Sequence, residues 1–286
     1  MSQRANRALG ASRTLSSLVP PPESRGSDRH HPIYALWDEL SRFPAAEIDA
    51  SCLRLMAVLA SWLKADNAAW IGAARLVDGT RALRDPLLGW RARSFVFLHP
   101  PDANEAALVK RILADRGDEA GLPTVAAVKL AGAFRVHRLR DGFVDFEALR
   151  KTLHYRAFYQ ALGVDDRLWV ATPLTADAES YFVFDKRNTR SRFTAANAKL
   201  AGDTLRGLVW LQRRLMHAQG LSLVKQPLTP MERRVIRCLL TEKSEKEIAS
   251  ALKQSEHTTH SHIKQIYRKF GVNGRAGLMA IWLSRM

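Results

Sequence analysis

Hydrophobic residues recur along most of the chain at spacings typical of helices and strands, and polar stretches separate these segments. Helical periodicity alternates with short runs rich in β-branched and aromatic residues. The expected elements are a short helix from Tyr34 ending near Pro44, a helix over 48–63, strands over 68–77 and 88–98, helices over 104–116, 123–131 and 146–162, strands over 167–171 and 181–184 with an acidic loop between them, and a helix over 194–220. The stretch from Phe134 to Leu139 stays ambiguous.

Blocks of helices around two pairs of strands predict an α+β domain over residues 32–193. A single long helix over 194–220, capped by Thr194, is expected to connect this domain through a linker at 221–227 to residues 228–286. Residues 1–31 are rich in Arg, Ser and Pro. They contain no apolar run long enough for a signal peptide or a membrane span, so we expect a disordered tail.

Residues 228–286 show four short helical patterns separated by tight corners. Two helix starts place a glutamate three residues after a hydroxyl side chain, which is the pattern of a capping box. The start and stop signals are Thr229 with Pro230 and Glu232, Ser244 with Glu247, Ser255, Gly271 at a left-handed C-terminal turn, and Asn273. Four capped helices in about sixty residues predict a compact all-α module that contains a helix-turn-helix.

The third of these helices has two chemically different faces. One side carries the stripe Thr259, Ile263, Ile266 and Phe270, at the spacing of a buried helix face. The opposite side carries His257, Ser261, Lys264 and Arg268, flanked by His260 and Gln265. That face has cations and hydrogen-bonding groups and no acid, which favours an anionic partner; such donors reach base edges in a major groove, while Lys and Arg hold phosphates.

Three motifs in this region resemble the LuxR/GerE-type DNA-binding domain of bacterial transcription regulators: Leu228-Thr-Pro-x-Glu, Lys246-Glu-Ile-Ala, and Thr258-x-x-x-His262-Ile-x-x-Ile-Tyr-Arg-Lys-Phe-Gly-Val. The resemblance covers residues 226–286. It implies a four-helix domain whose third helix enters the major groove and whose fourth helix contributes to a dimer.

Site residues follow from this resemblance by position. The implied base readers are His260, Ser261 and Lys264, and the implied phosphate contacts are Lys246, Thr258, Arg268 and Lys269. The sequence departs from the family pattern at Thr259, where a small aliphatic residue is usual, at His260, where a cation is usual, and at Lys243, where a glycine is usual.

The N-terminal domain resembles GAF- or PAS-type sensor domains more weakly. The stretches that carry this likeness begin at His154, Leu168, Glu179 and Arg192. Sensor domains bind ligands in apolar pockets, and the aromatic candidates on or beside the expected strands are Trp70, Trp90, Phe97, Trp169 and Tyr181. Plain sheet core is the alternative interpretation of these residues.

Composition supports a DNA partner. The net charge is +16. Residues 182–225 hold 9 Lys and Arg against 2 Asp and Glu, and residues 226–286 hold 11 against 5, so most of the excess lies at one end. Cys52 and Cys238 lie among apolar neighbours, which indicates free thiols in a reducing cytoplasm. No zinc-type spacing, nucleophile motif or phosphate loop is present, so we expect no metal, no cofactor and no catalytic site.

The sequence thus predicts a cytoplasmic, DNA-binding transcription regulator that acts as a homodimer. The candidate dimer contacts are Leu205, Leu208, Leu278, Ile281 and Trp282. Its expected partners are double-stranded DNA, a second copy of the chain, RNA polymerase and an unidentified small-molecule ligand, with no membrane. Two alternatives stay open: an N-terminal enzyme with a DNA-locating module, and a protein-interaction adaptor that keeps the helix-turn-helix fold.

Overall fold

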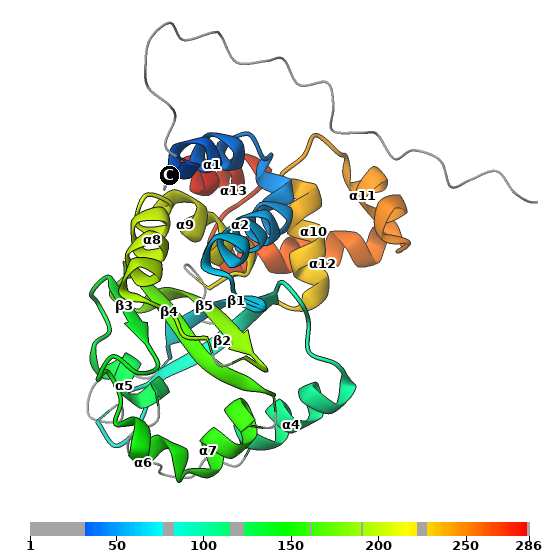
Figure 1. Cartoon of the computed structure of the whole chain (residues 1–286). Coiled ribbons are helices and arrows are strands. Elements are labelled where there is room, and N and C mark those ends of the chain that lie inside the picture. Colours follow the sequence, from blue (N-terminus) through cyan, green and yellow to red (C-terminus); the bar gives the residue numbers. More distant parts are fainter. Residues whose placement is uncertain are drawn as a thin grey trace, which may run out of the picture.

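A five-stranded antiparallel sheet forms the centre of the N-terminal domain (Figure 1). The structure, a computed structural model, describes residues 32–76, 83–114, 123–160, 162–189, 191–221 and 228–284. The strands lie in the order β2-β1-β5-β4-β3. Their bounds are Asn67–Arg75 for β1, Trp90–Phe97 for β2, Arg135–Arg138 for β3, Val164–Thr175 for β4 and Ala178–Arg187 for β5. Four strands were expected, and β3 resolves the ambiguous stretch as a fifth.

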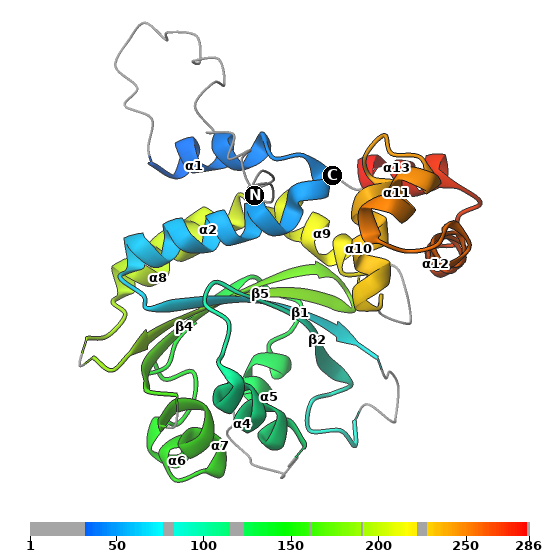
Figure 2. The same ribbon diagram turned by 90° about the vertical axis from the view of Figure 1, so that its right-hand side faces the viewer.

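Helices cover both faces of this sheet (Figure 2). We call the side of α2 the upper face and the side of α5 the lower face, as Figure 2 draws them. The upper layer contains α1 (Pro32–Ser41), the 3-10 helix η1 (Ala45–Glu47), α2 (Ile48–Leu63), α8 (Ala195–Arg206) and α9 (Val209–Ala218). The lower layer contains α4 (Ala103–Ala114), α5 (Pro123–Lys129), α6 (Phe146–Arg150), α7 (Leu153–Tyr155) and the π-helical turn η2 (Arg156–Gln160).

The main core lies between the upper helices and the sheet. Strand alternation directs Trp70, Leu168 and Phe182 into one apolar cluster with residues of α2, α8 and α9. The indole N–H of the fully buried Trp70 donates to Ser180 Oγ at 2.8 Å. Burying each large apolar side chain contributes roughly 1.5–3 kcal/mol, so this layer holds the sheet in place. Among the described residues, no helix combines the length and the apolar character needed to cross a bilayer.

The predicted acidic loop between the last two strands is wrong. β4 and β5 form a hairpin in which Thr175 pairs with Ala178 across a turn at residues 176–177. Glu179 therefore belongs to β5, and its side chain is fully buried. Glu179 interrupts the apolar pattern of β5, and sequence patterning therefore predicts a loop where the strand begins.

The predicted helix over 146–162 is also broken, into α6, α7 and η2. Thr152 ends the first piece and begins the second. Its hydroxyl donates to the carbonyl of Leu149 at 2.7 Å and accepts from the N–H of Tyr155 at 3.0 Å. A side chain that satisfies backbone groups on both sides replaces the helical hydrogen bonds there.

The long helix predicted over 194–220 is two helices, α8 and α9, because the chain turns at residues 207–208. The indole N–H of Trp37 donates to the carbonyl of Thr204 at 3.0 Å, and Gln212 Nε2 donates to that of Leu205 at 2.9 Å. The Leu205 carbonyl also accepts from the N–H of Leu208 at 3.1 Å, three residues on instead of the four of a continuous α-helix. A Cβ at Gly207 would lie 2.1 Å from Cζ2 of Trp37, so only glycine allows this approach.

The C-terminal domain consists of α10 (Pro230–Leu239), α11 (Glu245–Leu252), α12 (Glu256–Phe270) and α13 (Arg275–Ser284). Both predicted capping boxes are confirmed, as are the Ser255 cap and the left-handed Gly271. The predicted cap at Asn273 is not: the N–H of Leu278 donates to the carbonyl of Gly274, so α13 begins one residue later.

The two domains share one continuous apolar cluster. α10 packs against η1 and α9, and Asp49 of α2 forms an ion pair with Arg237 of α10 at 2.6 Å. Leu228, just before α10, is buried against Gly220, where φ is +72°. The C-terminal domain is therefore docked on the upper layer, and α12 lies on the far side of α10 (Figures 1 and 2).

Candidate nucleic-acid interface

The buried side of α12 fixes how this helix is oriented. Thr259, Ile263, Ile266 and Phe270 are its buried residues, as the sequence predicts. They belong to, or lie among, the core formed with α10, α11 and α13. Ser255 begins the helix by accepting from the N–H of Thr258 at 3.0 Å. With both ends capped and one stripe anchored, the opposite side of α12 must face outward.

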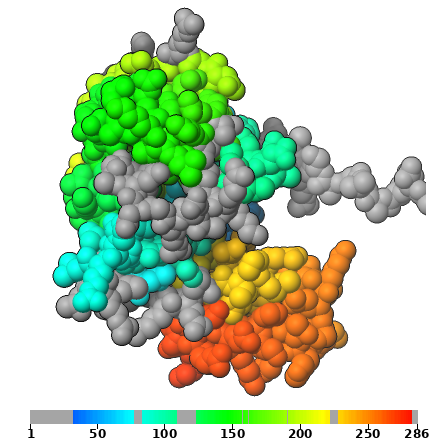
Figure 3. All heavy atoms as spheres, turned by 90° about the horizontal axis from the view of Figure 1, so that it is seen from below, coloured from blue at the N-terminus to red at the C-terminus, as the bar shows by residue number. Residues whose placement is uncertain are grey.

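That outer side carries the predicted contact residues. His257, Thr258, His260, Lys264, Gln265 and Arg268 are exposed. Ser261 is half-buried, and its hydroxyl donates to the carbonyl of His257 at 3.0 Å. Lys246, in the first turn of α11, is exposed as well. In Figure 3 the orange to red spheres of this domain form a lobe beside the sheet domain, so the domain is accessible to a large ligand.

One acid lies beside this face, although the sequence pattern of α12 contains none there. Glu245, the first residue of α11, places Oε2 at 2.9 Å from Nδ1 of His260. The helical wheel of a single helix cannot show it because the carboxylate comes from the preceding helix. The only signal in the sequence was that Glu245 follows the cap Ser244, at the corner between the two helices.

Lys269 does not lie with the exposed cations. Its amine is 2.6 Å from Oε2 of Glu232, and the two side chains are 15% and 1% exposed. Glu232 Oε2 also accepts from the N–H of Thr229 at 2.7 Å. Burial raises the pKa of Glu232, but the hydrogen bonds from Lys269 and Thr229 outweigh it and hold that pKa below its usual value. The predicted phosphate contact at Lys269 is therefore corrected to an ion pair that joins α10 to α12.

The predicted ligand residues do not form one group. Trp70 lies in the core of the upper layer. Trp90 and Tyr181 meet Val128 of α5 in a cluster on the lower face, and Trp169 packs with residues of α6, α7 and η2. Phe97 stacks on Phe95 of the same edge strand, with ring centroids 6.1 Å apart. Trp70 is therefore removed from the candidate ligand contacts, because strands alternate and it points to the opposite side.

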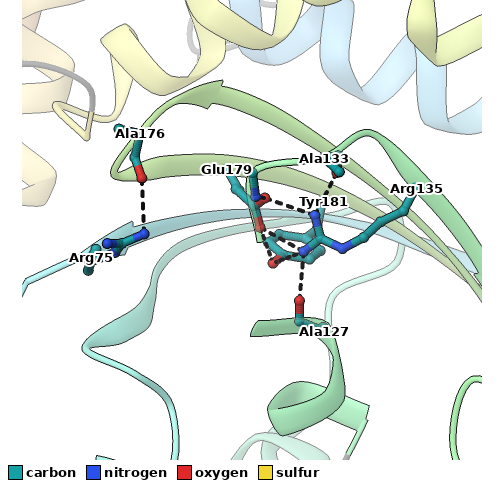
Figure 4. Close-up of polar contacts among 8 residues, drawn as sticks. Arg75, Ala127, Ala133, Arg135, Ala176, Glu179 and Tyr181 are labelled. Carbon is teal, nitrogen blue, oxygen red and sulfur yellow. Dashed lines mark hydrogen bonds and ion pairs between the residues drawn. The ribbon is translucent and has the colours of Figure 1, made fainter. Parts of the chain in front are cut away.

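A buried polar cluster that sequence reasoning missed also lies on the lower face (Figure 4). Arg135 Nη1 and Nη2 donate to the two carboxylate oxygens of Glu179, both at 2.8 Å. Tyr181 Oη donates to the same carboxylate, and Gly132 N–H donates to it at 2.8 Å. Burial, followed by the Glu179 carboxylate, raises the pKa of Tyr181. The Arg135 guanidinium also reaches the carbonyl of Ala127 in α5 at 2.8 Å, so the cluster ties the lower layer to the sheet.

The predicted dimer residues are mostly used inside the single chain. Leu205, Leu208 and Leu278 are each 0% exposed and belong to the main core. They are therefore corrected to core residues, because apolar periodicity cannot distinguish a buried helix face from an exposed one. Ile281 is half-buried, and the side chain of Trp282 lies outside the described residues.

The groove between α1 and α2 was not expected from the sequence. It has a volume of about 460 Å³ and is lined by residues that include Leu36, Val58 and Trp62. Arg54 and Glu39 form a bidentate ion pair across it, with Nε of Arg54 at 2.6 Å from Oε1 of Glu39. It lies on the upper layer, away from the lower-face aromatic residues.

Residues 226–281 match the family described as "Bacterial regulatory proteins, luxR family". The chain is 46% identical over 52 residues to the spore germination protein GerE of Bacillus subtilis (strain 168), which covers 18% of this chain and 70% of GerE. A structure of SdiA in complex with octanoyl-rac-glycerol is similar with a TM-score of 0.47 and 14% identity, covering 92% of this chain and 97% of that one. The crystal structure of the VqsR LBD domain from Pseudomonas aeruginosa is similar with a TM-score of 0.43 and 17% identity, covering 67% of this chain and 98% of that one.

The family match falls on the domain that presents the exposed side of α12. The 52 residues aligned with GerE cover most of the length of GerE at 46% identity. The chain belongs to the luxR family of bacterial regulatory proteins.

Proposed function

We propose that the protein regulates transcription by placing α12 in the major groove of double-stranded DNA. The observation that best supports this is the division of α12 into two sides. Its apolar stripe is buried, while Lys264 and Arg268 project from the opposite side without an ion pair among the described residues. Exposed cations and amide or hydroxyl groups on one helix face suit phosphates and base edges together.

The proposed roles follow the position of each side chain on the helix. His260, Ser261 and Lys264, near the middle of α12, read bases, and His257 and Gln265 flank them. Arg268, Thr258 and Lys246 hold phosphates on either side. Lys269 is left out because its amine is engaged with Glu232.

The test is DNA binding by the full-length chain to sequences selected from random or genomic DNA. Lys264→Ala is expected to weaken binding to the selected site by about 5- to 100-fold, which corresponds to roughly 1–3 kcal/mol for a lost base or phosphate contact. Lys199→Ala is a control for the loss of an exposed lysine elsewhere: Lys199 lies on α8, at the other end of the molecule from α12, and its amine is 2.6 Å from Asp203 of the same helix (Figures 1 and 2). Equal losses in the two variants would contradict the assignment of α12.

We also propose that the protein binds its operator as a homodimer, since paired modules double the contacts to a two-fold site. The exposed side of α13, which includes Ala276 and Ala280, is the surface left for this contact once the core leucines are excluded, and Ile281 is half-buried against the main core. Light scattering of the chain with and without its selected DNA is expected to show two copies per duplex. A single copy per duplex at micromolar concentration would refute the dimer.

Finally, we propose that the N-terminal domain senses a small molecule on the lower face of the sheet. Trp90, Trp169, Phe97 and Tyr181 share that face, and none of them belongs to the main core. Native mass spectrometry of the purified full-length chain is expected to detect a bound small molecule whose occupancy falls in Trp169→Leu. A chain that carries no adduct, and whose DNA affinity does not change when cell extract is added, would argue for an assembly role instead.

A further inference from the structure

Glu245 and His260 join the two helices of the helix-turn-helix at the edge of its outer face. Nδ1 of His260 lies 2.9 Å from Oε2 of Glu245, and each side chain is 48% exposed. Glu245 is the first residue of α11, and His260 lies one turn into α12. The pair therefore sits where a reading helix meets the helix that precedes it, within reach of solvent and of a ligand.

The Glu245 carboxylate determines which ring nitrogen of His260 is engaged in a hydrogen bond within the protein. An ionised carboxylate only accepts hydrogen bonds, so the hydrogen must be on Nδ1 of His260. Nε2 then becomes the nitrogen that can meet another partner, and it makes no hydrogen bond within the described ranges. A half-exposed histidine without this bond would sample several rotamers, and ordering it on binding would cost conformational entropy.

We propose that Glu245 is a positioning residue for base recognition: it holds His260 so that Nε2 meets one base edge in a fixed orientation. This inference rests on the proposed function, in which α12 enters the major groove. A ring that is held by a second helix discriminates between base edges. Because the ring cannot rotate toward a wrong base, the hydrogen bond to that base is lost. Glu245 itself need not touch the DNA.

The carboxylate also has a simple electrostatic effect that must be separated from positioning. An acid near the DNA lowers affinity for every sequence, since it repels phosphates. Glu256, in the first turn of α12, is an exposed acid of the same charge, and its side chain has no ion pair among the described residues. Glu256→Ala therefore matches Glu245→Ala in charge, and both lose an acid from a helix N-terminus.

The experiment is selection of bound sequences from a random DNA pool by the full-length wild type, His260→Ala, Glu245→Ala and Glu256→Ala. His260→Ala is expected to relax the preference at one base position by about 5- to 10-fold. Glu245→Ala is expected to relax the same position by a similar factor, and a variant that combines His260→Ala with Glu245→Ala is expected to relax it by no more than His260→Ala alone. Glu256→Ala is expected to raise affinity for all sequences without changing the preference.

The outcomes separate this inference from the proposed function. A wild type that selects no sequence would overturn both. A wild type with a clear preference that Glu245→Ala leaves unchanged, or that Glu245→Ala changes at a position other than the one His260→Ala affects, would overturn the positioning role alone. Loss of preference in Glu256→Ala to the same degree would show a charge effect and would also overturn it. Thermal unfolding of each variant confirms that the domain remains folded.

Discussion

Replacing Lys269 by methionine tests whether this residue serves the fold or the DNA. The Glu232 side chain is 1% exposed, and its Oε2 has two partners, the Lys269 amine and the Thr229 N–H. Lys269→Met leaves a buried carboxylate with one hydrogen bond. Breaking one half of a buried ion pair typically costs roughly 3–5 kcal/mol. Since the Lys269 side chain is 15% exposed and water can reach it in part, we expect the free energy of unfolding to fall by about 3 kcal/mol, the lower end of that range.

A second substitution separates that cost from any loss of a DNA contact. Glu232→Gln removes the buried charge but keeps an oxygen that accepts from Thr229, as glutamine does in a capping box. The double variant is expected to lie within about 1 kcal/mol of the wild type, because a neutral pair needs no counter-ion. The two side chains touch, so their effects should be strongly non-additive.

Hydrogen exchange is the suitable assay, because it reports α10 and α12 separately from the sheet domain. Lys269→Met should lose protection in both helices, and the double variant should regain it. If Lys269 contacts phosphate and not Glu232, Lys269→Met would keep its protection in both helices, bind DNA about tenfold more weakly and show a salt dependence reduced by about one ion. That result would refute the assignment of Lys269 to the ion pair with Glu232.

Three further predictions concern packing and pH. Thr259 is fully buried and its hydroxyl has no partner in the described part of the chain, so Thr259→Val should raise the free energy of unfolding by about 1 kcal/mol in urea titrations. Gly207→Ala should destabilise the chain by roughly 1–3 kcal/mol and lower its melting temperature, despite alanine's better helix propensity, because the new methyl group meets the Trp37 ring. Burial and the nearby Arg167 lower the pKa of His154 to about 4. The unfolded chain takes up that proton first, so stability should fall between about pH 6.5 and pH 4, and His154→Phe should flatten this dependence in pH-dependent unfolding.

The sequence predicts the C-terminal domain well because its signals are local. A capping box needs two residues three positions apart, and the apolar stripe of α12 repeats within one helix. Each therefore appears in a short window of sequence. Strand positions are predicted nearly as well, since β1 and β2 carry long apolar and aromatic runs.

Breaks inside predicted helices could not be found in this way. The turn at Gly207 depends on the indole of Trp37, which is more than 160 positions away in the chain and takes the carbonyl of Thr204. Nothing in the window around Gly207 shows that a distant ring lies there. Glycine alone was a weak signal, because isolated glycines also occur inside intact helices.

The same limit explains why the roles of several charged residues were predicted wrongly. Glu179 looked like loop, Lys269 looked like a phosphate contact, and the outer face of α12 looked free of acids. In each case the deciding partner comes from another element. Glu179 pairs with Arg135 of β3, and Lys269 pairs with Glu232 of α10. His260 of α12 pairs with Glu245 of α11. An apolar side chain is placed by its own helix or strand period, but a charged one is placed by a partner that the period does not contain. The contacts that decide specificity in this domain must therefore be taken from the packing of α11 and α12 together, and not from α12 alone.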